Sequence, residues 1–414
     1  MQKIYNAITT QECIATCLIA ILFVAQPFSG ISRVPLFVLT GIGVWICLRD
    51  KEKTYSTSLY QLGIISLLFL IPGLISFWNT YSPEKTAFFV LIMAGFYFSG
   101  VAIISTLWND VCFKLLAAII SITSCLWVID AIVQLSVGKD MLGIPVMPSG
   151  RLSGPFSGTT HLGMLLVVLL PVTLSWLEKY NRILSLTYLA GLVFVLIFSD
   201  VRTDQVTFLI AVPLYYMWTK RGRFTLLFIL LPIILSVAGF SSLIAQARPF
   251  NVSSVKSVEK LIDSPFTYKQ ADKFLSGRLD IWMTAWNMTK ANPITGVGAK
   301  AFNYAFEEYE VSDQYNVVDG KGGAYHAHHP WVSMLAEKGI VGLFGLIAVI
   351  VLMFSITTRN SGWANLHTYP WLLSFVLLIN PLNSMPPLFK TWWFPIVLLV
   401  IVAHLVDVAK KKTT

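Results

Sequence analysis

Long runs of apolar residues, separated by short polar segments, recur along the whole chain. A helix needs about 20 apolar residues to cross the hydrocarbon of a bilayer, so each run predicts a transmembrane helix. The twelve runs are residues 12–28, 34–48, 58–78, 86–107, 112–136, 160–177, 183–199, 203–218, 224–246, 331–357, 368–386 and 391–408. The pattern therefore predicts an all-α fold, a polytopic membrane bundle of about twelve helices.

One polar segment is much longer than the others. Residues 247–329, between the ninth and tenth runs, carry nine Lys or Arg and nine Asp or Glu. A segment of that length without a function is uncommon in a compact fold. We therefore expect three regions: membrane spans in 1–246, a helical loop domain in 247–329, and further spans in 330–414.

Composition excludes a soluble globular protein. The 414 residues are 56% hydrophobic and only 12% charged, with a mean hydropathy of +0.70, whereas soluble chains are about 25% charged. The net charge of +9 would suit nucleic acid, but the charges lie between the apolar runs, so no nucleic-acid partner is expected. The five cysteines lie in or beside apolar runs and form no disulfide or zinc pattern.

The distribution of basic residues predicts the orientation. With a cytoplasmic N-terminus, the inner loops hold fourteen Lys or Arg and the short outer loops hold six. Cytoplasmic loops carry this excess in membrane proteins. Both termini are then cytoplasmic, and residues 247–329 lie outside, among the lipids and solutes of the outer face.

A histidine cluster stands where the long segment meets the tenth run. His326, His328 and His329 precede Pro330, a residue suited to the first turn of a helix. An imidazole at a helix N-terminus tends towards its neutral form, which a general base requires. Glu337 is expected inside the same helix, facing the bundle. The cluster could instead be a polar helix cap or a metal site, although no Cys or acidic residue lies at a ligand spacing.

A second feature is the helix predicted after its capping residue, Ser276. It carries one apolar stripe, formed by Leu279, Trp282, Met283 and Trp286. The stripe predicts a helix lying on the membrane surface or on the bundle, with both Trp at the interface. Arg278 occupies the first turn, where the helix dipole disfavours a cation, so it has either a function or a salt bridge to Asp272 or Asp280. After this helix, Gly296 and Gly298 are interpreted as a tight turn rather than a dinucleotide site.

Three more polar residues lie on the predicted outer side. Arg202 occupies a short turn between Asp200 and Asp204; its guanidinium either pairs with these acids or grips a phosphate. Arg151 and His161 form a further polar patch.

Several of these stretches resemble one family. His328 to Gly339 is similar to the His-Asn-x-x-Leu-x-x-Leu-x-Glu-x-Gly signature of the O-antigen ligase and polymerase superfamily, bacterial membrane glycosyltransferases of the GT-C type. Arg278 and Trp282, followed by Pro293, Gly296, Gly298 and Phe302, resemble the segment before it, and residues 199–203 resemble its Ser-x-Ser-Arg turn. The chain has His329 where the family usually has Asn, so the register assigns the family's histidine to His328.

The resemblance implies an inverting glycosyltransferase that needs no metal or cofactor. It implies a donor linked to undecaprenyl diphosphate, a lipid A–core acceptor, and a site at the periplasmic face of the bacterial inner membrane. His328 would be catalytic, and Arg202 and Arg278 would bind the diphosphate. The residues expected to support them are His326, His329, Glu337, Arg151, His161 and Trp282.

Other functions fit parts of the pattern. An O-antigen polymerase or a protein O-oligosaccharyltransferase would use the same donor chemistry. A transporter would place charges near the bilayer midplane; Asp130, within the fifth run, is the one such acid, and we expect it to pair with a neighbouring span.

Overall fold

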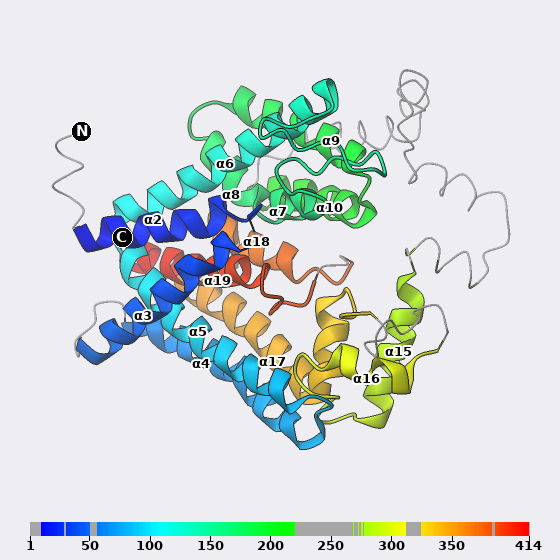
Figure 1. The fold of residues 1–414 in the computed structure, drawn as a ribbon. Coiled ribbons are helices and arrows are strands. Elements are labelled where there is room, and N and C mark those ends of the chain that lie inside the picture. Colours follow the sequence, from blue (N-terminus) through cyan, green and yellow to red (C-terminus); the bar gives the residue numbers. More distant parts are fainter. Residues whose placement is uncertain are drawn as a thin grey trace. The chain divides into compact units, whose positions relative to one another are not determined.

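The computed structural model describes most of the chain. The described residues are 10–28, 30–49, 56–219, 277–311, 324–382 and 386–413, with Tyr268, Asp272 and Leu275. Within these ranges the chain forms fourteen α-helices and three short 3₁₀ helices, and no strand (Figure 1). This confirms the predicted all-α class for the described residues. The chain divides into two compact units, which are described separately.

Unit 1 comprises residues 1–32, 109–265 and 364–383. Its helices are α2 (Thr10–Val24), α6 (Asp110–Val137), α7 (His161–Val168), α8 (Leu170–Leu177), α9 (Arg182–Ser199), α10 (Arg202–Trp218) and α18 (Pro370–Leu378). Helix α6 is central, because α2, α8 and α9 all pack against it. Phe23 of α2 contacts Trp127 of α6 with ring centroids 5.0 Å apart, so aromatic packing joins the first helix to this centre.

Side chains of α6 hold the segment that follows it. The Gln134 side-chain oxygen accepts the N–H groups of Ser153 (3.0 Å) and Gly154 (2.9 Å). Asp130 Oδ1 accepts the N–H of Met141 at 2.8 Å. The prediction that Asp130 pairs with a neighbouring span is therefore wrong. Instead, the segment after α6 folds back over the end of this helix, and its Met141 N–H binds the Asp130 carboxylate.

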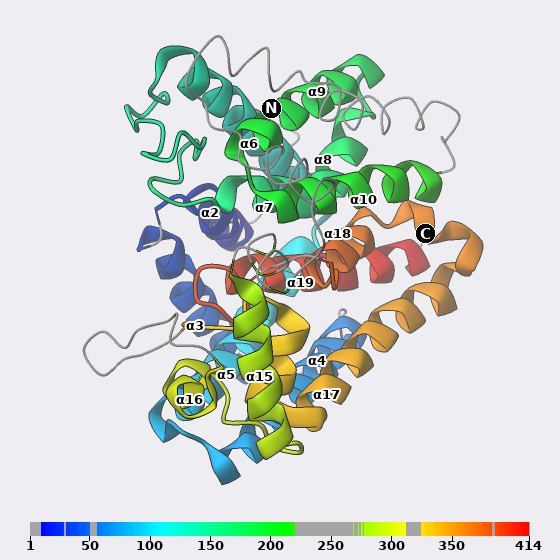
Figure 2. The same cartoon turned by 90° about the vertical axis from the view of Figure 1, so that its right-hand side faces the viewer.

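Unit 2 comprises residues 33–108, 266–363 and 384–414. Its helices are α3 (Val34–Arg49), α4 (Ser56–Ile75), α5 (Pro83–Leu107), α15 (Arg278–Ala291), α16 (Phe302–Tyr309), α17 (Pro330–Ser361) and α19 (Phe394–Thr413), with the 3₁₀ turn η2 (Ser76–Asn79) after α4. Helix α5 packs against α3, α4 and α19, and α17 packs against α4, α15 and α19. Figures 1 and 2 both show α15 beside the first turns of α17.

Helix α17 is broken at Gly339, and a turn fills the break. Gly339 has φ 60° and ψ −160°, a conformation that a residue with a Cβ rarely adopts. The break frees the carbonyls of Ala336 and Glu337, which accept the N–H groups of Val297 and Gly298, each at 3.0 Å. The Ile340 N–H, which loses its partner four residues back, donates to the Pro293 carbonyl at 2.8 Å.

The glycines of this turn allow its close approach to α17. A Cβ added at Gly296, which has φ 65°, would lie 2.3 Å from the Glu337 carbonyl carbon. The prediction of a tight turn around Gly296 and Gly298 is thereby confirmed. Since the turn hydrogen-bonds to the residues on either side of Gly339, it fixes the position of Glu337 and the start of α17.

Helices occupy eleven of the twelve predicted runs; the run 224–246 lies outside the described residues. Five of the described helical segments are long and apolar enough to cross a membrane: Thr57–Asn79, Pro83–Leu107, Asp110–Val137, Arg182–Ser199 and Pro330–Ser361. Others are shorter than predicted, because the run 160–177 divides at Leu169 and α18 ends at Leu378. These long apolar helices indicate a multi-pass membrane protein.

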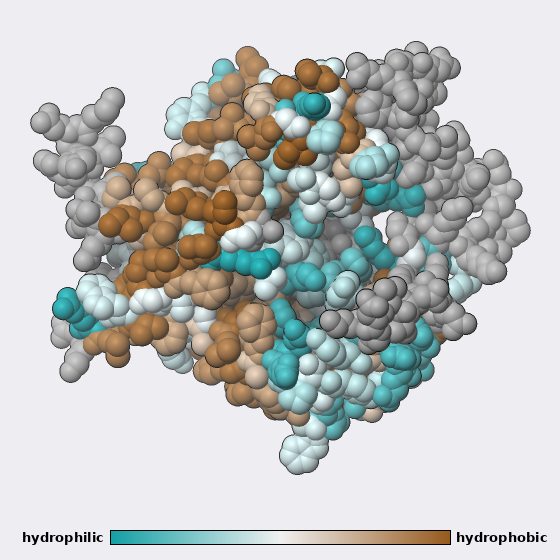
Figure 3. Space-filling view, in the orientation of Figure 1, coloured by the Kyte–Doolittle hydropathy of each residue, from teal (hydrophilic) through white to brown (hydrophobic). Residues whose placement is uncertain are grey.

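The surface of unit 2 agrees with this. Large apolar side chains on α3 and α5 are exposed, among them Phe37 (75%), Leu48 (78%) and Leu91 (67%). Figure 3 shows apolar surface over the middle of these helices and polar surface over the end that carries α15 and α16. Apolar faces of this kind suit contact with lipid.

Candidate functional site

The histidine cluster forms the entrance to α17, as predicted. His329 is the N-cap residue, and its Nδ1 accepts the Val332 N–H at 3.3 Å. His328 has φ 50°, so the backbone turns sharply before the helix. Its N–H donates to His326 Nδ1 at 3.1 Å, and the rings of His326 and His328 lie 4.0 Å apart. The interpretation of the cluster as a polar helix cap therefore applies to His329 and not to His328.

Burial keeps two of these imidazoles neutral. It lowers the pKa of His326 to about 3 and that of His328 to about 4. The positive charges of Arg278 and Lys390 lower both pKa values further. Both rings are thus in the base form at neutral pH, as expected, but the main cause is desolvation rather than the helix dipole.

The histidines do not form a metal site of three ligands. Nδ1 of His326 and Nδ1 of His329 already accept backbone N–H groups. Within the described ranges, no three His, Cys, Asp or Glu side chains are grouped so as to hold a metal ion.

Helix α15 places Arg278 beside this cluster. The helix begins at Arg278, with Gly277 as its N-cap residue in the left-handed conformation; Ser276, the predicted cap, lies outside the described residues. Asp272 Oδ1 accepts the Leu279 N–H at 2.9 Å and so caps the helix from the preceding segment. The positive charge of Arg278 is one of the causes that lower the pKa of His328.

Trp282 connects α15 to the histidines. Its indole N–H donates to the Ala327 carbonyl at 2.9 Å, and its ring meets the His329 ring edge-on at 5.5 Å. Of the predicted apolar stripe, Met283 (41%) and Trp286 (51%) are exposed and do not pack on the bundle; contact of this face with the membrane surface stays a prediction. The buried face is formed by Ile281, Thr284, Ala285 and Met288, which join a core with the side chains of α16.

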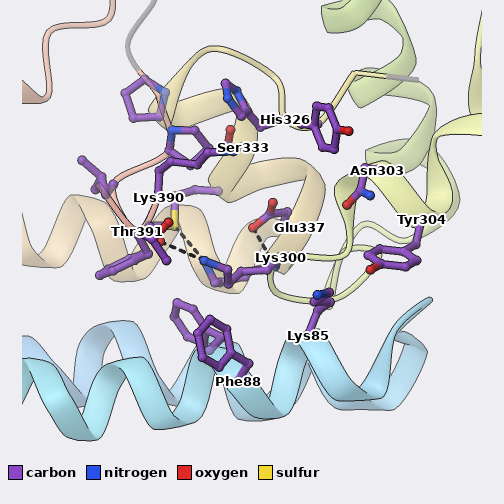
Figure 4. A pocket seen from close by; sticks show the side chains of 18 residues that line it. Lys85, Phe88, Lys300, Asn303, Tyr304, His326, Ser333, Glu337, Lys390 and Thr391 are labelled. Atoms are coloured by element: carbon purple, nitrogen blue, oxygen red, sulfur yellow. Dashed lines mark hydrogen bonds between the residues drawn. The ribbon is translucent and has the colours of Figure 1, made fainter. Parts of the chain in front are cut away.

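Unit 2 contains a cavity of about 400 Å³ lined by residues of α5, α16, α17 and the segment before α19 (Figure 4). Glu337 and His326, both predicted site residues, line it. So do four lysines that the sequence did not single out: Lys85, Lys300, Lys338 and Lys390. Lys338 interrupts a predicted span, and a charge inside a span is a signal of function or pairing that could have identified it.

Lys300 and Glu337 line the cavity and are hydrogen-bonded to each other. The Lys300 backbone N–H donates to Glu337 Oε2 at 3.0 Å, and its Nζ donates to the Phe389 carbonyl at 3.0 Å. Lys300 has φ 60°, an uncommon conformation for a residue with a side chain. Burial lowers its pKa to about 8, against the opposing effect of the Glu337 charge. The lysine is therefore held in an unusual backbone and electrostatic environment.

Lys338 is more deeply buried, with 3% of its surface exposed. Its Nζ lies 3.5 Å from the Met334 sulfur and 4.4 Å from the centroid of the Phe89 ring. Among the described residues, none of the four lysines forms an ion pair within 4.0 Å. Glu337 is the one carboxylate among the residues that line the cavity, so the cavity has an excess of positive charge.

The remaining predicted residues belong to unit 1. Arg151 Nη2 lies 3.5 Å from Asp200 Oδ2, in the turn between α9 and α10. Arg202 is the first residue of α10 and His161 the first of α7, and these two helices pack together. Unit 1 thus brings Arg151, His161 and the turn of Arg202 into one neighbourhood, while unit 2 brings together Arg278, Trp282, the histidines and Glu337.

Comparison with known proteins adds one match. None of the curated proteins compared with the chain matches it. Residues 187–347, however, match the family model described as O-antigen ligase. The matched stretch includes Arg202, Arg278, the histidine cluster and Glu337. The resemblance found in the sequence is therefore confirmed over these residues, which are similar to a family that covers O-antigen ligases and related membrane glycosyltransferases.

Proposed function

We propose that the protein is an O-antigen ligase. It moves a polysaccharide from undecaprenyl diphosphate to the lipid A–core, at the periplasmic face of the bacterial inner membrane, with inversion and without a metal ion. The observation that carries this proposal is the contact of α15, the helix of Arg278, with the histidine segment: the Trp282 indole N–H donates to the Ala327 carbonyl at 2.9 Å, inside the stretch that matches the family model.

The proposed reaction is a single displacement. The acceptor hydroxyl oxygen attacks the anomeric carbon as the bond to the diphosphate oxygen breaks, and the electron pair leaves with the diphosphate. His328 takes the hydroxyl proton as general base. Arg202 and Arg278 bind the diphosphate and stabilise its growing charge. Attack opposite the leaving group inverts the anomeric centre.

The proposed topology follows from the loop charges. About twelve spans surround the site, both termini are cytoplasmic, and residues 247–329 form a periplasmic loop domain between the regions 1–246 and 330–414. On this topology Lys85, Lys300, Lys390 and the histidines all belong to the outer face. One cavity is lined by Lys85, Lys300, Lys390 and His326. This supports the proposal that their segments lie at the same face of the membrane.

The test is a transfer assay with the full chain in membranes. Arg202→Ala and Arg278→Ala should each abolish transfer of a diphosphate-linked glycan while expression holds. Arg182→Ala, at the exposed first residue of α9, is the matched control and should keep normal activity. Near-normal transfer by either variant would refute the role given to that arginine.

Lipopolysaccharide from a deletion strain separates a ligase from its relatives. Loss of a ligase leaves full-length polymer on the lipid carrier, whereas loss of a polymerase leaves core capped with one repeat unit. Loss of a protein-directed transferase leaves an unglycosylated protein instead. Either of the last two patterns would replace the ligase assignment.

A further inference from the structure

The lysine cavity has the size and charge of a ligand site. Its volume of about 400 Å³ lies within the roughly 300–1,000 Å³ typical of small-molecule pockets. Four lysines and one glutamate line it. An ammonium is a compact charge with three donors and a common binder of phosphate groups. The chemistry of the lining therefore favours an anion.

The burial of Lys338 points to a ligand as well. A buried charge is strongly disfavoured unless a partner replaces its water. Lys338 has a sulfur atom and two aromatic rings, those of Phe89 and Phe389, close to its ammonium. These are weak substitutes for an oxygen anion. A phosphate oxygen in the cavity would supply the missing interaction.

The cavity is distinct from the surroundings of Arg278. His326 lines the cavity, whereas Arg278, Trp282 and His328 do not. Yet both neighbourhoods contact the histidine segment: Lys390 Nζ lies 5.8 Å from the centroid of the Tyr325 ring, and Trp282 of α15 donates to the Ala327 carbonyl. The histidine segment therefore has two cationic neighbours: α15 with Arg278, and the lysine cavity with Lys390. A transfer enzyme has two substrates to hold near one base.

We infer that this cavity is a second anion site, where Lys300, Lys338 and Lys390 bind a phosphate group of one of the two transfer substrates. The identity of the substrates rests on the proposed function. The phosphate belongs either to the donor diphosphate or to a phosphorylated acceptor lipid, and Arg278 lies outside the cavity in both cases. Lys85, exposed at the start of α5, forms the rim.

The first test measures binding of inorganic pyrophosphate to the full chain in lipid nanodiscs at low ionic strength. Lys300→Gln and Lys390→Gln should each weaken binding about tenfold, since each removes one close charge. Lys290→Gln, at an exposed lysine of α15, should bind like the unmodified protein. Lys390 is only partly buried, so its variant is expected to fold, and a melting curve checks it. Equal binding by all three variants would overturn the inference.

The second test identifies the source of the phosphate. Transfer is measured with Lys390→Gln against varied donor, then against varied acceptor with and without its phosphate groups. A several-fold higher KM for the donor assigns the cavity to the diphosphate; a higher KM only for the phosphorylated acceptor assigns it to the acceptor. Unchanged KM values for both substrates would overturn the inference. If the unmodified protein showed no transfer while pyrophosphate binding still depended on the lysines, the proposed function would fail and the anion site would stand.

Discussion

In unit 1, Gln134 of α6 binds the backbone of Ser153 and Gly154, and Arg151 lies beside Asp200. In unit 2, the cavity beside α17 holds four lysines and one glutamate, with no ion pair among them within 4.0 Å. The first arrangement uses polar atoms to hold a loop, whereas the second leaves charge facing an open space. Polar residues with internal partners stabilise a fold, and those without are available to a ligand.

The largest effect should come from substitution of His328, the proposed general base. Removing a general base lowers a rate by about 10²–10⁴-fold, so His328→Ala should lose transfer on that scale. His329→Ala removes an N-cap acceptor, which costs about 1 kcal/mol of stability, and should keep most activity. Initial rates and melting curves of both variants measure this. A larger rate loss for His329→Ala would move the catalytic role to that residue.

The paired groups of unit 1 should matter for stability instead. Gln134→Leu leaves the N–H groups of Ser153 and Gly154 without their acceptor, and each unsatisfied buried group costs about 1–3 kcal/mol. We expect a clearly lower melting temperature in nanodiscs and unchanged affinity for pyrophosphate. A normal melting temperature would mean that this hydrogen-bonded segment does not stabilise unit 1.

Anion binding by unit 2 should depend on pH through Lys300. Its pKa of about 8 means that the ammonium is charged below this pH and neutral above it. Glu337, Lys390, Lys338 and Lys85 all influence this group, and a bound phosphate raises its pKa. Pyrophosphate affinity should therefore fall, by about tenfold for one lost charge, as the pH rises above 8.

The control for this pH dependence is Lys300→Arg, which stays charged throughout the range. Both proteins are titrated from about pH 6.5 to about pH 9.5. Protonation of pyrophosphate itself affects both titrations equally, so the difference between them reports on residue 300. Parallel curves for the two proteins would exclude Lys300 as the titrating group.

The smallest expected effect is a gain in stability in unit 2. Lys338→Met replaces a buried ammonium with an apolar side chain of similar length, next to Met334 and Phe89. Replacing buried charge with apolar groups is often neutral or stabilising, by about 1 kcal/mol or more. The melting temperature should hold or rise while pyrophosphate binding weakens. A marked loss of stability would show that Lys338 has a structural partner.

Features that depend on residues close together in the sequence were predictable from the sequence. Apolar runs predicted the helices, because only a helix satisfies the backbone within an apolar segment. Pro330 after the histidines predicted the start of α17, and Gly296 and Gly298 predicted the turn. The buried position of Glu337 followed from helical spacing. Each of these depends on backbone hydrogen bonds and periodicity within one segment.

Tertiary structure alone decided the rest. The stripe of α15 did not show which face packs, since Ile281 and Met288 form an equally regular face that fits the core with α16. The partner of Asp130 depended on how the following segment folds back. The cavity joins Lys85, Lys300, Lys338 and Lys390, which lie on four segments far apart in the chain. No local pattern links such residues, because their proximity arises only when the helices pack and the break at Gly339 lets the turn dock beside Glu337.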